Sequence, residues 1–277
     1  MIRTSPLLLL LFISLLTLNT GHAYLEGDLF ADATQEQKDA PKLIPADAGF
    51  HNNLGNVYFS TGLLDDAIRE YKEALRIKPD LVEARYNLGN AYVKKDLLDN
   101  AIAEYKEALR IEPDYTDVHN NLGTAYYRKG LFDDAIRELK EALRAKPHDG
   151  KAHYNLGNAY FGKGLWEEAI REFKEALRIK PDDAQAHNNL GVAYSKKGLL
   201  ENAIEESKQA FEIDPDDGDA CYNLGCFYSL QGKTKESLEY LRKAIVLDSE
   251  NRETARTDAD FENMRNDPQF RQLLGLD

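Results

Sequence analysis

The chain has 277 residues, of which 43% are hydrophobic and 30% are charged, so it is long enough for one or two domains and polar enough to be soluble. It carries 35 Lys and Arg against 48 Asp and Glu, a formal net charge of -13, which argues against general binding of nucleic-acid phosphates or anionic membranes. Its two cysteines are too few for a disulfide framework, and no Cys/His cluster has the spacing of zinc ligands.

The start of the chain has the order of a secretory signal. Arg3 supplies a positive charge, an apolar run follows from Leu7 to Leu18, and the small residue Ala23 comes after it. A run of about twelve residues is too short to span a bilayer comfortably. We therefore predict cleavage after Ala23 and a periplasmic or secreted mature protein, with an uncleaved membrane anchor as the alternative. Residues 24–47 are mostly polar, show no period and predict a flexible spacer.

The next part of the chain repeats itself every 34 residues. Leu-Gly pairs recur at this spacing, at Leu54-Gly55, Leu88-Gly89, Leu122-Gly123, Leu156-Gly157, Leu190-Gly191 and Leu224-Gly225. Five prolines keep the same step, at Pro79, Pro113, Pro147, Pro181 and Pro215. A fixed period of this length indicates a solenoid in which stacked helix pairs bury a continuous core.

Each repeat predicts two helices, which we call helix A and helix B. Counted from the first repeat's start at residue 48, helix A covers about positions 2–14 and helix B about positions 18–30. Position 8 is glycine and position 20 is alanine or serine, so the two helices are expected to pack closely. Position 15, which is glycine except for Asp96, predicts the turn between them. Asp80 with Glu83, and Asp182 with Gln185, have the spacing of capping boxes before the following helix.

The fourth repeat contains the segment AHYNLGNAYFGKGLWEEAIREFKEALRIKPDD. This pattern resembles the tetratricopeptide repeat (TPR) family. The resemblance implies an all-α, right-handed superhelical solenoid of six helix-turn-helix units. The organisation we expect is a signal peptide at 1–23, a flexible spacer at 24–47, six repeats at 48–81, 82–115, 116–149, 150–183, 184–217 and 218–251, and C-terminal capping helices at 252–277.

The C-terminal segment predicts short helices that cover the end of the stack. Phe261, Met264, Phe270 and Leu274 are placed to cover the apolar surface that the sixth repeat leaves exposed. A tail that docks on another protein is the alternative.

The sequence shows no motif of an enzyme or of a metal site. It contains no GxSxG, HExxH or phosphate-binding glycine loop. Four histidines share position 4 of their repeats, namely His51, His119, His153 and His187. Equivalent side chains in neighbouring repeats lie about 8–10 Å apart, which is too far for a shared zinc ion. We therefore expect structural histidines and no catalytic residue, metal or cofactor.

The two cysteines, Cys221 and Cys226, lie five residues apart on one predicted helix. Their side chains diverge at this spacing, so we expect no disulfide between them. Burial among apolar residues is the expected role, and an intermolecular disulfide of Cys226 is the alternative.

A polar stripe runs along helix A at positions 2, 6, 9 and 13, which share one face of a helix. Position 6 is asparagine in all six repeats: Asn53, Asn87, Asn121, Asn155, Asn189 and Asn223. Position 9 adds Asn56, Asn90 and Asn158. A carboxamide donates and accepts together, so it can pair with the backbone of an extended peptide without reading side chains. The alternative is that these asparagines only form hydrogen bonds between helices.

We call the asparagines at positions 6 and 9 the asparagine ladder. Aromatic and basic residues lie beside this ladder. Position 5 alternates between Asn52, Asn120 and Asn188 in odd repeats and Tyr86, Tyr154 and Tyr222 in even repeats, which suggests duplication of a two-repeat block. Amphipathic aromatics beside amides are typical of peptide-binding grooves. We therefore predict that the asparagines at positions 6 and 9 bind peptide together with Tyr86, Tyr127, Tyr154, Lys94 and Arg128.

The ladder is similar to that of the superhelical arm of protein O-linked N-acetylglucosamine transferases, which implies that it holds extended polypeptide. The catalytic half of those enzymes has no counterpart in this sequence. The carboxylate clamp of co-chaperone repeat domains has lysine at position 5 of its first unit, where this chain has Asn52. Binding of a C-terminal carboxylate is therefore not expected.

Together these features predict a non-enzymatic scaffold that binds an extended peptide of a partner protein and neither nucleic acid nor a small-molecule substrate. One alternative is a self-assembling structural module. The other is an accessory subunit of an envelope secretion, pilus or polysaccharide assembly machine.

Overall fold

The computed structural model describes residues 47–276, and this part of the chain contains α-helices, one 3-10 helix and no strand. The predicted signal peptide and nearly all of the predicted spacer lie outside the described residues. Six helix pairs follow one another along the chain: α3 Ala48–Ser60 with α4 Leu64–Ile77, α5 Val82–Lys94 with α6 Leu98–Ile111, α7 Thr116–Arg128 with α8 Phe132–Ala145, α9 Gly150–Gly162 with α10 Trp166–Ile179, α11 Ala184–Lys196 with α12 Leu200–Ile213, and α13 Gly218–Leu230 with α14 Thr234–Leu247.

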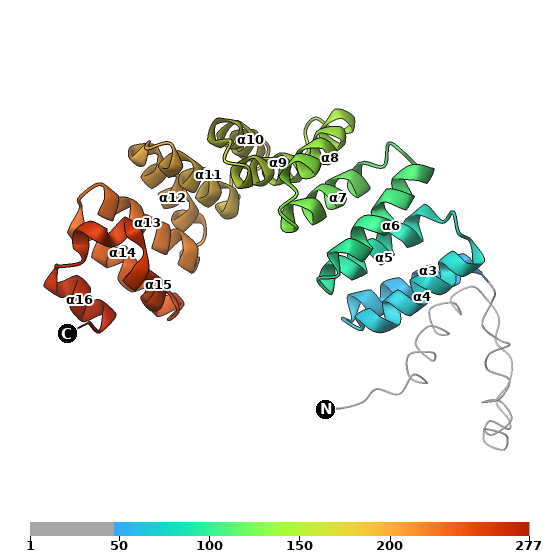
Figure 1. Cartoon of the computed structure of the whole chain (residues 1–277), viewed down its shortest axis with the longest axis horizontal. Helices are drawn as coiled ribbons and strands as arrows, with labels where there is room; N and C mark the ends of the chain where they lie inside the picture. Colours follow the sequence, from blue (N-terminus) through green and yellow to red (C-terminus); the bar gives the residue numbers. More distant parts are fainter. Residues whose placement is uncertain (1–46, 277) are drawn as a thin grey trace, which may run out of the picture. The chain divides into compact units, whose positions relative to one another are not determined.

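Each pair packs on the next, so the helices form an all-α solenoid (Figure 1). The first helix of a pair is helix A and the second is helix B. Helix A occupies positions 1–13 and helix B positions 17–30, which is within one residue of the boundaries expected from the repeat pattern. No described helix is long and apolar enough to cross a membrane.

The turn between helix A and helix B requires a left-handed backbone at position 15. Five glycines take positive φ there, at Gly62, Gly130, Gly164, Gly198 and Gly232. Asp96 adopts the same conformation with φ 60° in the second repeat. Aspartate tolerates this region better than most residues, so the turn is kept without glycine.

Close packing inside a pair depends on the glycine at position 8. A Cβ on Gly157 would lie 2.6 Å from the Phe173 ring, and one on Gly123 would lie 2.6 Å from Leu139 Cγ. The expected contact with position 20 is present through the backbone, since the same Cβ on Gly123 would lie 3.2 Å from Ala135 O. In the first four repeats the glycine therefore makes room chiefly for the large side chain at position 24 of helix B.

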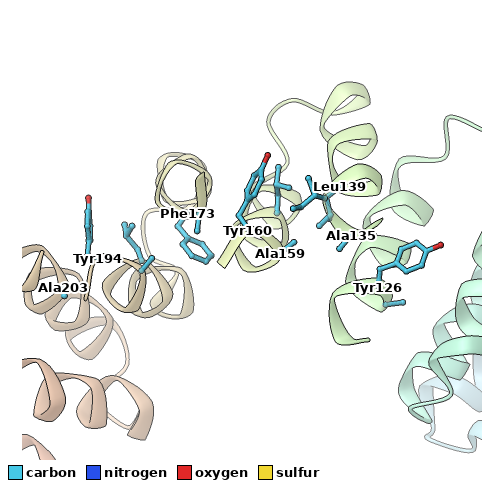
Figure 2. Packing of buried hydrophobic residues seen from close by; sticks show 14 of the residues in the cluster. Tyr126, Ala135, Leu139, Ala159, Tyr160, Phe173, Tyr194 and Ala203 are labelled. Carbon is cyan, nitrogen blue, oxygen red and sulfur yellow. The ribbon is translucent and has the colours of Figure 1, made fainter. Parts of the chain in front are cut away.

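The core continues from pair to pair without a break at a repeat boundary. Figure 2 shows Tyr126, Tyr160 and Tyr194 on successive helices A, with Leu139 and Phe173 on the helices B between them. These residues are all buried and belong to one apolar cluster that extends to the C-terminal helices. A solenoid obtains its stability in this way, because one pair cannot bury its own apolar face.

Charged side chains also join neighbouring pairs on the outside. Lysine at position 14 binds the acid at position 18 of the preceding repeat in the pairs Lys95–Asp65, Lys129–Asp99, Lys163–Asp133 and Lys197–Glu167. Lysine at position 25 lies over the tyrosine ring at position 11 of the next repeat in the pairs Lys72–Tyr92, Lys106–Tyr126, Lys140–Tyr160, Lys174–Tyr194 and Lys208–Tyr228.

The predicted capping boxes are wrong in detail. Helix α5 begins after Leu81, which makes no side-chain cap, so Asp80 lies outside the helix start. Helix α11 is capped by Asp183, whose side chain accepts from the Ala186 amide, and not by Asp182. A two-residue aspartate run offers two candidate caps, and only the backbone geometry decides between them.

The C-terminal segment follows as α15 Asn251–Thr257, the 3-10 helix η1 Ala259–Met264 and α16 Pro268–Leu274. Phe261, Met264, Phe270 and Leu274 are at most 1% exposed and belong to the same core cluster as the repeats. The side chain of Asp267 caps α16 by accepting from the Gln269 and Phe270 amides, and Gly275 ends it with φ 66°. The predicted short helices are thus present and packed on the last pair, and the second of them is a 3-10 helix.

Candidate functional site

We call the residues at positions 2, 5, 6, 9, 12 and 13 of the six helices A the helix-A face. Neighbouring helices A contact one another along the chain, for example α7 with α9 and α11 with α13. Equivalent side chains of successive repeats are therefore close enough to interact, and the position 6 asparagines do so.

In even repeats, the asparagine at position 6 donates to the asparagine at position 5 of the odd repeat before it. The Nδ2···Oδ1 distances are 3.0, 2.9 and 2.9 Å for the pairs Asn87–Asn52, Asn155–Asn120 and Asn223–Asn188. Asn155 Nδ2 also lies 3.2 Å from Thr124 Oγ1. The accepting asparagines are buried, with 2%, 5% and 7% exposure for Asn52, Asn120 and Asn188.

In odd repeats, the partner is different but the direction is the same. Asn121 Nδ2 donates to Asn90 Oδ1 at 2.8 Å and lies 3.3 Å from the Tyr86 hydroxyl. Asn189 Nδ2 donates to Asn158 Oδ1 at 2.9 Å and to the Tyr154 hydroxyl at 3.0 Å. The alternation at position 5 in the sequence thus corresponds to two kinds of hydrogen bond between repeats.

Two of the three asparagines at position 9, Asn56 and Asn90, accept a hydrogen bond from a tyrosine of helix B. Asn56 Oδ1 accepts from the Tyr71 hydroxyl at 2.8 Å, and Asn90 Oδ1 accepts from the Tyr105 hydroxyl at 2.6 Å. Burial raises the pKa of Tyr71 to about 12 and also raises the pKa of Tyr105, so both hydroxyls stay protonated as donors. The oxygen atoms of these asparagines are therefore engaged within the chain.

The asparagine ladder therefore has fewer free hydrogen-bonding groups for a peptide than the sequence predicts. The Nδ2 groups at position 6 do not point freely to solvent, except at Asn53, which is exposed and has no repeat before it. The Oδ1 atoms of the other five, Asn87, Asn121, Asn155, Asn189 and Asn223, accept no hydrogen bond from any described residue. In each repeat after the first, the position 6 asparagine is thus fixed through its Nδ2 group, and its Oδ1 atom is left without a partner in the described chain.

The predicted basic residues at position 13 lie at the end of helix A. Lys94 Nζ lies 4.9 Å from the centre of the Phe59 ring of the preceding repeat. Arg128 Nη2 lies 2.7 Å from Asp96 Oδ1, and its Nη1 donates to Val93 O at 3.2 Å. Both side chains therefore contact the repeat before their own.

The predicted aromatic residues are half-buried against helix B or a neighbouring loop. Tyr86 stacks on Tyr115 with ring centres 5.5 Å apart, Tyr127 packs on Phe132 at 6.0 Å, and Tyr154 packs on Phe173 at 5.9 Å. They border the asparagine ladder and are partly available to a ligand.

Sequence reasoning missed the part that Asn52, Asn120, Asn188 and Thr124 take in the ladder. It noted the alternation at position 5 as a sign of duplication and did not assign these residues to the site. The asparagine that recurs at position 5 was a usable signal. A polar side chain next to the polar stripe needs a hydrogen-bond partner if it is buried. Asn52 uses both sides of its amide, since its Nδ2 donates to Glu83 Oε1 at 3.0 Å.

The position 4 histidines join helix A to helix B within a repeat. The Nδ1 atoms of His51, His119, His153 and His187 lie 2.7 to 2.9 Å from the glutamate at position 23 of their own repeats. In the last three, Nε2 faces the carbonyl oxygen of the proline before the repeat. Arg85 takes the same position and the same kinds of partner, Glu104 Oε2 and Pro79 O. Position 4 therefore contacts a glutamate of helix B in the first five repeats, whereas the sixth repeat has Cys221 there.

The end of the helix-A face is closed by the C-terminal segment. Asp258 Oδ2 accepts from the Tyr222 hydroxyl at 2.8 Å and faces Cys226 Sγ at 3.8 Å. Cys226, Asp258 and Asp260 form a group whose potential metal-ligand atoms lie within 4.8 Å of one another. Burial raises the pKa of the Cys226 thiol, which favours a protonated sulfur that donates to the carboxylate. Both cysteines are buried and free, which disfavours an intermolecular disulfide of Cys226.

A family model described as the Cilia and flagella-associated protein 70 C-terminal domain, a TPR domain, matches residues 20–258. The chain belongs to this TPR family. No curated protein matches the sequence. TPR repeats of this kind are typically non-enzymatic modules of protein interaction, and this chain has the fold of such a scaffold.

Solved TPR structures resemble this chain over most of their own length. YrrB, described as a TPR protein with an unusual peptide-binding site, has 28% identity and a TM-score of 0.56 over 66% of this chain and 94% of its own. MamA has 28% identity and a TM-score of 0.56 over 61% and 92%. PilF of Pseudomonas aeruginosa has a TM-score of 0.66 over 79% and 96%, but at 17% identity it shows the fold alone.

Proposed function

We propose that the chain is a non-enzymatic scaffold whose helix-A face binds an extended peptide segment of a partner protein. The observation that carries this proposal is the row of position 6 Oδ1 atoms, one in each repeat after the first, that accept no hydrogen bond within the described chain. Each is fixed by its own amide donor, so little side-chain entropy is lost when a peptide N–H binds it. The peptide-binding site named for YrrB supports the same reading.

The charge of the chain fits this kind of partner. A net charge of -13 disfavours nucleic acid, and the ladder presents amide oxygens that recognise a backbone without a defined side chain. No cofactor or small-molecule substrate is part of the proposal.

We further propose that the chain acts outside the cytoplasm, in the periplasm or after secretion. The support is the order of Arg3, the apolar run and Ala23, which lie outside the described residues. N-terminal sequencing of the protein from its native source should begin at Tyr24, and a mature chain that starts at Met1 would indicate a retained anchor.

The place of binding can be tested with peptides selected on the full chain from a random linear library displayed on phage. Lys94 or Lys196, both at position 13, is replaced by a photo-crosslinking amino acid. The matched controls carry it at Lys72 or Lys174, which are also exposed lysines but belong to helix B. We expect crosslinks from the helix-A face alone, and a peptide that crosslinks only from helix B would contradict the proposal.

A further inference from the structure

The helix-A face ends in a cleft of about 510 Å³ near the C-terminal repeats. Tyr154, Asn188 and Asn189 line one side of it. The other side is formed by the α12–α13 loop and by the turn after α14, and it carries five carboxylates: Asp214, Asp216, Asp217, Asp219 and Asp248. Within residues 47–276, no Lys, Arg or His lines the cleft. A pocket of this size is within the range of about 300–1,000 Å³ that is typical of ligand sites.

A change at one repeat position explains why the acids are left without cations. Position 31 is lysine in the third and fourth repeats, where Lys146 lies 3.2 Å from Asp117 and Lys180 lies 3.1 Å from Asp183. The same position is aspartate in the last two repeats, at Asp214 and Asp248. Position 31 is also acidic in the second repeat, at Glu112, but at this cleft the acids of two successive repeats lie together with Asp216, Asp217 and Asp219.

Three of the five carboxylates are engaged by backbone amides. Asp217 caps α13, Asp214 accepts from the Asp216 amide, and Asp248 accepts from the Glu250 amide. The carboxylates of Asp216 and Asp219 accept no hydrogen bond and form no ion pair with any described residue. These two exposed acids are the ones available to a ligand.

A largely buried asparagine side chain, that of Asn188, also lines the cleft. Asn188 is 7% exposed and lines the cleft, and its Oδ1 accepts from Asn223. Its Nδ2 donates to no described residue, whereas Nδ2 of the equivalent Asn52 donates to Glu83. The residue that corresponds to Glu83 is Asp219, which is one methylene shorter and does not bind Asn188. The Nδ2 group of this well-fixed side chain is therefore available to a ligand in the cleft that brings an acceptor.

The arrangement of the acids favours an extended organic cation over a metal ion. Among the described residues, the group of His, Cys, Asp and Glu whose ligand atoms converge within 4.8 Å is Cys226, Asp258 and Asp260, and it includes none of the cleft acids. A divalent cation needs several oxygens at about 2.0–2.6 Å. A lysine or arginine side chain can instead reach carboxylates that lie apart.

We propose, on the basis of the peptide-binding function above, that this cleft binds a lysine or arginine side chain of the partner's extended segment. Asp216 and Asp219 pair with the cation, and Asn188 Nδ2 donates to a backbone carbonyl beside it. Repeats two to five then hold the backbone without sequence preference, and the cleft selects a basic residue in one register.

The test selects peptides on the full chain from the same phage-displayed random library and measures affinity in EDTA. The variant is Asp216→Asn with Asp219→Asn. The control is Asp80→Asn with Asp182→Asn, which changes the net charge equally at exposed acids outside the cleft. Each selected peptide is also made with its basic residue replaced by glutamine.

We expect basic residues in the selected peptides and a loss of affinity of about threefold or more in the cleft variant, with no loss in the control. The glutamine peptide should be weaker on the wild-type chain and insensitive to the cleft variant. Peptides that crosslink from Lys94 or Lys196 positions but ignore the cleft variant would overturn the basic-residue proposal and leave the proposed function standing. Binding that is lost in EDTA, or equal losses in variant and control, would also overturn it. Crosslinks from helix B alone, or a library without any binder, would contradict both proposals.

Discussion

At the scale of single residues, the turn between helix A and helix B shows how one backbone angle limits the side chain. Gly130 has φ 73°, and an added Cβ there would meet no atom within 4 Å. Asp96 takes φ 60° at the equivalent position of the second repeat. The requirement at position 15 is therefore one of backbone conformation and not of space.

A substitution at Gly130 separates these two causes. Gly130→Ala should lower the free energy of unfolding by about 1–2 kcal/mol, because alanine is strained in the left-handed region. Gly130→Asp should cost less, since Asp96 already shows that aspartate is accepted. Urea denaturation of the full chain measures both, and equal losses would show that the backbone angle is not the cause.

Single residues also show the limit of sequence reasoning. The pattern predicted which asparagines recur, because the period places them at one position of every repeat. It could not predict that Nδ2 of Asn155 binds Asn120, because the partner depends on the lateral register of two helices that are 35 residues apart in sequence. The same holds for the free Oδ1 atoms, which exist only because the donors are engaged.

At the scale of the elements, the position 4 side chain connects helix A, helix B and the preceding loop. His119 lies 2.9 Å from Glu138 Oε2 and 2.8 Å from Pro113 O, and both partners are acceptors. A ring that faces two acceptors is best satisfied when both nitrogens carry protons. The hydrogen bond to Glu138 raises the pKa of His119, and the bond to Glu206 does the same for His187.

This pairing predicts a stability that falls as the pH rises. The folded pKa values of His119 and His187 lie above the unfolded value of about 6.5, so their contribution is complete below that pH and is lost as the pH rises through the folded values. Urea midpoints of the full chain between about pH 6 and about pH 9 should show the decline.

The control is the double variant His119→Arg with His187→Arg, which copies Arg85 and keeps its charge throughout this range. The variant should lose most of the decline. An equal decline in both proteins would show that other groups control the pH dependence.

The elements themselves followed closely from the sequence, whereas their caps did not. Apolar spacing, the glycine turn and the proline step placed both helices of each pair. The choice between Asp182 and Asp183 as the cap of α11 depends on which carboxylate reaches the Ala186 amide, and the repeat pattern carries no information about that distance.

At the scale of the whole molecule, the described solenoid combines a repeated row of amide oxygens with an acidic cleft near the C-terminal repeats. Five repeats offer the same amide acceptor, so they can hold a backbone of any sequence. The acidic cleft breaks the repetition, because Asp214 and Asp248 at position 31 lie there with three further aspartates. The repetition could be predicted from the sequence but the cleft could not, because it forms where residues of α9 and α11 meet the α12–α13 loop and the turn after α14.

Binding of a peptide backbone by the free Oδ1 atoms of the ladder can be tested by comparing Asn155→Ala with Asn120→Ala. Both variants lose the same 2.9 Å hydrogen bond between repeats, so both should lose about 0.5–1.5 kcal/mol of stability. Asn155→Ala also removes the free Oδ1 atom of Asn155. Asn120→Ala keeps this atom, and the contact of Asn155 Nδ2 with Thr124 Oγ1 still holds the side chain in place. We measure the affinity of a library-selected peptide that crosslinks from the helix-A face. We expect an affinity about two- to tenfold weaker for Asn155→Ala and unchanged for Asn120→Ala, whereas equal affinities in the two variants would show that the free oxygens do not bind the peptide.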